Sequence, residues 1–169
     1  EGNPQSKFLS LIEKLRPEQV TLVPDADDAI TSNAGWDTIR HQDKLKEIIA
    51  GCKNIGVRTS IFVAPELKMI EGAAACGTDR IELYTEAYAH QYTQNPEKAV
   101  APYAAAAVLA HELGLGINAG HDLSLENIEY FAKNVPNLAE VSIGHALICE
   151  ALYQGLETVI QSYLKKLAH

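Results

Sequence analysis

From Val20 onward, short runs rich in apolar and β-branched residues alternate with longer segments of helical periodicity. This alternation is typical of a parallel sheet covered by helices, because parallel strands need a crossover connection. The runs are also nearly continuously apolar, which predicts strands that are buried on both faces. The expected strands are 20–23, 57–63, 80–85, 116–119 and 140–143, and the expected helices are 7–15, 43–52, 66–75, 97–113, 125–134 and 147–167.

Polar residues recur where the predicted strands end: Asp25, Glu82, Thr85, Asn118, His121, Ser142 and His145. A TIM (β/α)8 barrel gathers such strand ends into one ring. The alternative is an open doubly wound sheet, but the glycine fingerprint that usually follows its first strand is absent. The pattern therefore favours an α/β barrel. A complete barrel takes about 250 residues, so we expect the 169 residues to form a single domain without the first two βα units.

Two predicted strands finish in a glycine followed by a histidine, in the runs GINAGHD (Gly116–Asp122) and EVSIGHA (Glu140–Ala146). Glycine lets backbone N–H groups approach a ligand closely, and imidazole titrates near neutral pH. In βα barrels, phosphate binds in the loops after the last two strands. The two endings therefore predict an enzyme that acts on phosphorylated small molecules.

Charge and cysteine usage exclude several classes of partner. A net charge of -8 and a pI near 5.2 argue against nucleic acid and anionic membranes, which need concentrated Lys and Arg. Cys52, Cys76 and Cys149 are odd in number and widely spaced, so we expect buried thiols rather than disulfides or a zinc site. With no signal peptide or bilayer-spanning stretch in the sequence, a cytoplasmic location is expected.

The runs LVPDADDAITSNAGWD, RIELYTEAYA, GLGINAGHDL and EVSIGHALICEALYQGL resemble the pyridoxine 5′-phosphate synthase family, and the match extends over essentially the whole chain. The resemblance implies a (β/α)8 barrel that is commonly a homo-octamer. It implies condensation of 3-amino-2-oxopropyl phosphate with 1-deoxy-D-xylulose 5-phosphate to pyridoxine 5′-phosphate, with release of phosphate and water. It also implies that no metal or organic cofactor is needed.

By the same resemblance, two residues are expected to carry the chemistry and a third to support them. His121, in NAGHD, matches the family's histidine general acid on the seventh strand. Glu1 matches the catalytic glutamate at the end of the third strand, so the chain would run from that point to the eighth strand. Glu82, in IELYT, matches an acidic position that faces the barrel mouth and would support them. Glutamate as base and histidine as acid suit a ring closure that needs repeated proton transfers.

Four further residues are expected to bind substrate. Gly144 and His145 match the family's phosphate-binding pair, and Thr31 matches a threonine that contacts substrate after the fourth strand. Asp122 stands where the family often has glycine, so its carboxylate would have to turn away from a phosphate. A second departure is the run 25–27, Asp-Ala-Asp, where Glu-Lys-Arg is more typical.

Each assignment has a simpler structural alternative. His121 could be a hydrogen-bonded histidine, His145 an unliganded helix start, Glu82 a partner of Arg80 or Lys68, and Glu1 only a chain terminus. Other functions also stay open, namely a truncated barrel that is catalytically silent, a phosphate-binding module, or another phosphate-binding barrel such as a lyase or isomerase. A Schiff-base aldolase would need a lysine at a strand end, and none is present. Since two strands of the family's active site are missing, the chain alone is expected to be inactive.

Overall fold

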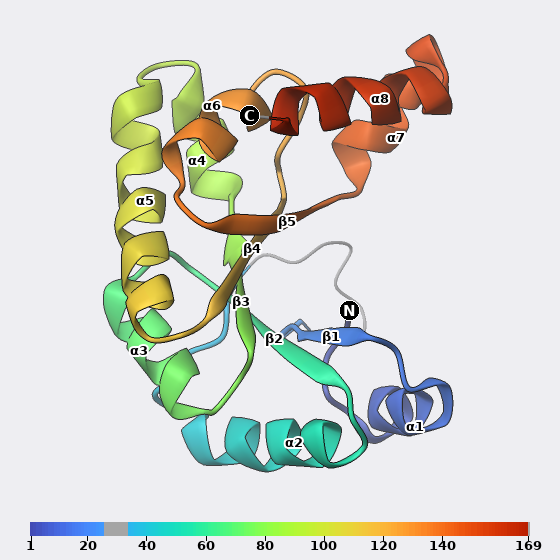
Figure 1. Ribbon diagram of the computed structural model, residues 1–169, viewed down its shortest axis with the longest axis vertical. Helices are drawn as coiled ribbons and strands as arrows, with labels where there is room; N and C mark the ends of the chain where they lie inside the picture. The colour runs from blue at the N-terminus through green and yellow to red at the C-terminus, as the bar shows by residue number, and fades with distance from the viewer. Residues whose placement is uncertain (26–33, 169) are drawn as a thin grey trace.

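A computed structural model describes residues 1–25 and 34–168, and within these ranges five parallel strands form one sheet. Their order in the sheet, β1-β2-β3-β4-β5, is their order in the sequence (Figure 1). All five predicted strands are confirmed, with ends shifted by one or two residues. They are β1 Gln19–Leu22, β2 Arg58–Val63, β3 Arg80–Tyr84, β4 Gly116–His121 and β5 Leu138–Ile143.

The described helices are α1 Ser6–Leu15, α2 Gln42–Asn54, α3 Leu67–Ala75, α4 Glu86–Tyr92, α5 Pro96–Glu112, α6 Ile128–Asn134, α7 His145–Gln154 and α8 Leu156–Leu167. Three of them, α4, α7 and α8, differ from expectation. The predicted helix 147–167 is divided at Gly155, whose φ of 85° lies in the left-handed region that glycine adopts without a Cβ clash. The short helix α4 had not been expected between β3 and α5.

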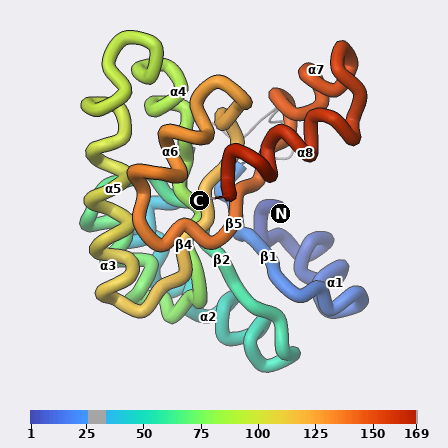
Figure 2. The backbone as a smooth tube through the Cα atoms, turned by 45° about the horizontal axis from the view of Figure 1, so that its top comes forward, coloured from blue at the N-terminus to red at the C-terminus, as the bar shows by residue number. Residues whose placement is uncertain are grey.

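Helices follow the outer face of the sheet, and α7 and α8 lie beyond its β5 edge (Figures 1 and 2). Side chains of the outer face, including Leu22, Ile61, Leu83 and Ile117, belong to the hydrophobic core. The opposite face is also buried, but it is polar, because Thr21, Ser60, Glu82 and Asn118 alternate with the core residues. The expected burial of the strands on both faces is therefore confirmed, although the inner face is lined by polar side chains.

The sheet curls about its polar face. The guanidinium of Arg58 on β2 lies 3.5 Å from the carboxylate of Glu140 on β5, although two strands separate them. Arg80 on β3 pairs with the same carboxylate and donates to Asn118 Oδ1 at 2.9 Å. Ion pairs between strands that are not neighbours require a curved sheet, and the fold is a parallel half-barrel.

Cys52 and Cys76 are buried as expected, but Cys149 is exposed on α7, a helix without buried residues. None of the helices in the two described ranges combines the length and the apolar character needed to cross a bilayer.

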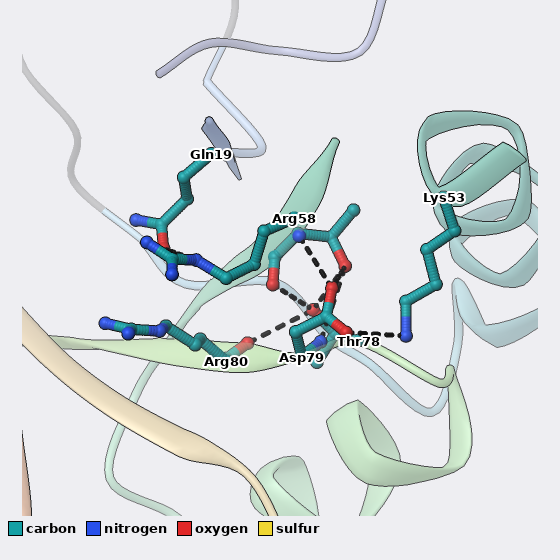
Figure 3. Close-up of polar contacts among 7 residues, drawn as sticks. Gln19, Lys53, Arg58, Thr78, Asp79 and Arg80 are labelled. Atoms are coloured by element: carbon teal, nitrogen blue, oxygen red, sulfur yellow. Dashed lines mark hydrogen bonds and ion pairs between the residues drawn. The ribbon is translucent and has the colours of Figure 1, made fainter. Parts of the chain in front are cut away.

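A cluster around Asp79 fixes the amino-terminal ends of β2 and β3 (Figure 3). One oxygen of Asp79 accepts from the backbone N–H of Thr59 at 2.8 Å and from its hydroxyl at 3.0 Å. The other oxygen lies 2.8 Å from Nζ of Lys53. Burial alone would raise the pKa of Asp79, but these partners outweigh it and lower the pKa below 3.8.

We expect Asp79→Ala to cost about 2 kcal/mol of unfolding free energy, because the buried N–H of Thr59 loses its acceptor. Lys53→Ala, the control, removes only a half-exposed ion pair and should cost less than about 1 kcal/mol. Since the pKa of Asp79 is depressed on folding, the stabilisation is present above pH 3.8 and is lost as the pH falls through the lower folded value. Urea titrations between pH 3 and 7 measure both variants. Equal losses at pH 7 would show that charge, and not hydrogen bonding, dominates.

Candidate active site

Glu1, Glu82 and His121 meet at the carboxyl-terminal end of the sheet. Nε2 of His121, at the end of β4, lies 2.7 Å from Oε1 of Glu1 and 4.0 Å from Oε1 of Glu82. Glu82 projects from β3 into the polar inner face, where its side chain is only 1% exposed. Its Oε2 accepts a hydrogen bond from the hydroxyl of Thr21 on β1 at 3.2 Å. The carboxyl groups of Glu1 and Glu82 therefore meet at the imidazole of His121.

Backbone hydrogen bonds to β1 hold Glu1 in place. The N–H of Gly2 donates to the carbonyl of Thr21, and the N–H of Val23 donates to the carbonyl of Gly2, each at 3.1 Å. This isolated parallel bridge lies on the side of β1 away from β2. The side chain of Asn3 adds a hydrogen bond to the carbonyl of Asp25 at 2.7 Å. Glu1 is therefore placed by main-chain pairing and is not simply a loose terminus.

The backbone of His121 is strained. Its φ is 97°, in a region that non-glycine residues rarely adopt and that costs about 1–3 kcal/mol. The preceding Gly120 leaves room for the cluster, because a Cβ there would lie 2.8 Å from Oε1 of Glu82 and 2.5 Å from the carbonyl oxygen of Ser142. The imidazole packs against the ring of Phe62 at 4.8 Å between centroids. Such strain persists only where the surroundings hold it, and it is frequent at functional sites.

The three groups shift one another's pKa values. The hydrogen bond that Nε2 of His121 donates to Glu1 is the main cause that raises the pKa of His121 above 6.5, and the charges of Glu82 and Asp122 act in the same direction. Burial opposes ionisation of Glu1, but the hydrogen bond and charge of His121 outweigh it and lower its pKa. Burial, with repulsion from Glu1, raises the pKa of Glu82 to about 7. The cluster therefore holds a charged acid–base pair beside a carboxyl group that exchanges protons near neutral pH.

A cavity of about 350 Å³ opens beside this cluster. Its lining residues are Glu86, Ala89, His90, His121, Asp122, His145 and Ala146. Gly144 is the N-cap of α7, and because glycine has no side chain, no side-chain hydrogen bond caps this helix. His145 and Ala146, at the start of α7, line this cavity. The first backbone N–H groups of a helix lack partners within the helix, so they are suited to bind an anion here.

The structure brings most of the predicted site residues together. Glu82, His121, Asp122, Gly144 and His145 all lie at this end of the sheet, and Glu1 joins them. Thr31 and most of the run 25–27 lie outside the described residues.

The simpler alternative for Glu82, an ion pair with Arg80 or Lys68, does not hold. Arg80 pairs with Glu140, and Lys68 pairs with Glu66, so neither is the partner of Glu82. Within the described ranges, Glu1, Glu82 and His121 also form the group whose ligand atoms could together hold a metal ion, since these atoms lie within 4.8 Å of one another. The hydrogen bond between Glu1 and His121, together with the pKa shifts of all three groups, fits proton transfer directly.

Sequence reasoning did not assign roles to two threonines of the site. Thr21 donates to Glu82, and the hydroxyl of Thr85 contacts the peptide groups on both sides of His121. Thr85 was visible as a polar residue at a strand end. Its partners are 35 and 37 residues away in the sequence, so no local pattern could identify them.

Comparison with known proteins shows the family to which the sequence is similar. The family model described as "Pyridoxal phosphate biosynthesis protein PdxJ" matches residues 1–169. The chain is 64% identical over 167 residues to a pyridoxine 5′-phosphate synthase of Flavobacterium johnsoniae, covering 99% of this chain and 70% of the relative. It is 60% identical, with the same coverage, to the protein of that name from Cytophaga hutchinsonii.

Solved structures of lower identity share the fold. The tryptophan synthase A-subunit of Pyrococcus furiosus superposes with a TM-score of 0.57 at 17% identity, over 95% of this chain and 58% of that chain. A structure of the Amycolatopsis orientalis BexX/CysO complex gives 0.58 at 17% identity, over 94% of this chain and 59% of that one. These likenesses identify a TIM-like α/β fold.

Proposed function

The chain belongs to the family of the pyridoxal phosphate biosynthesis protein PdxJ, and on this premise we propose that Glu1, His121 and Glu82 carry the proton transfers of pyridoxine 5′-phosphate synthesis. The observation that carries the proposal is the 2.7 Å contact between Glu1 and His121 beside the buried carboxyl group of Glu82. Synthase activity follows from the family and from relatives of this name that match 99% of the chain.

The substrates are 3-amino-2-oxopropyl phosphate and 1-deoxy-D-xylulose 5-phosphate. His121, whose raised pKa favours imidazolium, donates a proton to a departing hydroxyl or phosphate oxygen. Glu1, whose lowered pKa favours carboxylate, accepts protons during dehydration and enolisation. Glu82, with a pKa of about 7, exchanges a proton as the charge on its two neighbours changes.

The start of α7 is the proposed phosphate site. Backbone N–H groups at Gly144 and His145 would bind phosphate through their unsatisfied donors and the helix dipole. Burial and the charge of Glu86 raise the pKa of Asp122, the residue that follows His121 in the cavity lining. Thr31 remains a proposed substrate contact.

The five strands are proposed to be the later strands of an eight-stranded barrel. In support, the sheet is parallel and curled, and β1 carries an additional parallel bridge to Gly2 on its outer edge. The chain also covers 70% of its Flavobacterium johnsoniae relative. A cytoplasmic homo-oligomer, an octamer by family resemblance, is the matching proposal for assembly. The exposed apolar side chains Ile148, Leu152 and Tyr153 on α7 support a further contact surface.

The test compares the 169-residue chain with a chimera that adds the part of the Flavobacterium johnsoniae relative left uncovered by the match. We expect the chimera to convert the two phosphorylated substrates into pyridoxine 5′-phosphate and inorganic phosphate in equal amounts. The chain alone should give no product and should aggregate, because unpaired parallel edges invite association. Chromatographic product analysis and size-exclusion chromatography measure both results. An active, stable monomeric chain would contradict the barrel proposal, and an inactive but folded chimera would contradict the assigned roles.

A further inference from the structure

The hydroxyl of Thr85 bridges the two peptide groups that flank His121. It donates to the carbonyl of Gly120 at 2.6 Å and accepts from the N–H of Asp122 at 3.1 Å. The residue between these two contacts is His121, with its φ of 97°. Thr85 is fully buried, so water does not compete for either hydrogen bond.

Thr85 makes these contacts although it stands where a threonine normally serves its own helix. It is the N-cap of α4, a position at which a threonine side chain usually accepts from the second or third backbone N–H of the helix. Here the side chain makes no cap hydrogen bond. Its hydroxyl is directed to β4 and the following loop instead.

Tyr103 on α5 supplies the missing cap. Its hydroxyl accepts from the backbone N–H of Tyr88, the third residue of α4, at 3.3 Å and donates to the carbonyl of Tyr84 at 3.0 Å. The Tyr103 ring is buried and packs edge-on against Tyr88 and Phe131, which fixes its hydroxyl. The helix start is thus satisfied without the Thr85 side chain.

We propose that Thr85 is a positioning residue that holds His121 in its left-handed backbone conformation, with Tyr103 capping α4 in its place. This inference rests on the proposed function for the catalytic role of His121. The bridge fixes the direction in which the imidazole leaves the backbone, and that direction places Nε2 at 2.7 Å from Glu1. Without it, the strained residue is free to relax toward an extended conformation, and the imidazole turns away from Glu1 and Glu82.

Thr85→Val tests the bridge, because valine keeps the shape of threonine and removes both the donor and the acceptor. Thr85→Ser keeps the hydroxyl and is the rescue variant. Thr78→Val is the matched control, since Thr78 is also a buried threonine next to β3 but hydrogen-bonds to Thr59 at the opposite end of the sheet. The readout is the titration of the His121 imidazole, followed by NMR on the chimera described above, labelled with ¹⁵N-histidine and assigned by means of His121→Asn.

In the parent protein the groups that face His121 are Glu1, Glu82 and Asp122, and together they raise its pKa. Thr85→Val should return this pKa toward the ordinary value of 6.5, while Thr85→Ser and Thr78→Val should leave it raised. A purely structural role for Thr85 predicts a lower unfolding midpoint with an unchanged His121 titration. That outcome would overturn the proposal, as would a crystal structure of Thr85→Val in which φ of His121 is unchanged.

Kinetics on the product-forming enzyme separate this inference from the proposed function. Thr85→Val should lower kcat by about 10²-fold with little change in KM, as expected for a misplaced catalytic group. Thr85→Ser should restore most of the rate. If Thr85→Val shifts the pKa of His121 but neither the parent enzyme nor any variant forms product, the bridge is upheld and the catalytic role of His121 is contradicted. Full activity in Thr85→Val would contradict the bridge alone.

Discussion

Replacing His121 with asparagine is expected to lower kcat for pyridoxine 5′-phosphate formation by about 10²–10⁴-fold, the usual contribution of a general acid. Asparagine tolerates the left-handed region better than most residues, so the φ of 97° at this position should survive the change. Phosphate affinity should stay within about threefold of the parent, because the backbone N–H groups at the start of α7 are untouched. Stopped-flow assays give kcat, and isothermal calorimetry with inorganic phosphate gives the affinity.

His90→Asn is the matched control for this variant. His90 lines the same cavity, but its side chain is 78% exposed and lies 3.7 Å from the carboxylate of Glu86. Its loss should change kcat by less than about threefold, as for a residue that contributes no proton transfer. Equal losses in both variants would indicate that the cavity needs imidazole charge in general. Unchanged turnover in His121→Asn would remove His121 from the chemistry.

The order of strands was predictable because local patterns encode it. Apolar runs such as 57–63 and 116–119 each follow a helical segment, and the glycines that end those segments, Gly56 and Gly114, have positive φ values as a helix end requires. The short helix α4 carries no such signal. It contains seven residues, and it is held by packing of Tyr88 against Tyr103 and Phe131 from later parts of the chain. Tertiary contacts of this kind override weak local propensity.

The site was predictable in part for the same reason. The Gly-His endings identify His121 and His145, because glycine and histidine at a strand end form a local pattern. The inner face of the half-barrel leaves no comparable pattern. Its polar residues, such as Glu82 and Asn118, interrupt the apolar runs only singly, and they become a shared surface when the sheet curls. The ion pair of Arg58 with Glu140 spans 82 positions of the sequence and is a consequence of that curvature.

Replacing Glu1 with glutamine is expected to lower kcat by about 10²-fold, because the side chain keeps its shape and hydrogen-bonding capacity but can no longer accept a proton. The pKa of His121 should fall toward 6.5, since the hydrogen bond to the Glu1 carboxylate is the main cause that raises it. The pKa of Glu82 should fall as well, because repulsion from Glu1 helps to raise it. NMR titration of the imidazole and a pH–rate profile measure these shifts.

The same substitution should change stability only within a defined pH window. The raised pKa of His121 stabilises the fold fully below pH 6.5, and this stabilisation is lost as the pH rises through the folded pKa. The lowered pKa of Glu1 stabilises the fold above pH 4.5, and this stabilisation is lost as the pH falls through the folded pKa. The pair therefore contributes most between pH 4.5 and 6.5, by about 1 kcal/mol for groups that are partly exposed. Unfolding free energies of Glu1→Gln should differ from the parent chiefly there, while Glu47→Gln on the exposed surface of α2 should show no such maximum. A constant difference from pH 4 to 8 would mean that Glu1 acts on the fold by packing and not through its charge on His121.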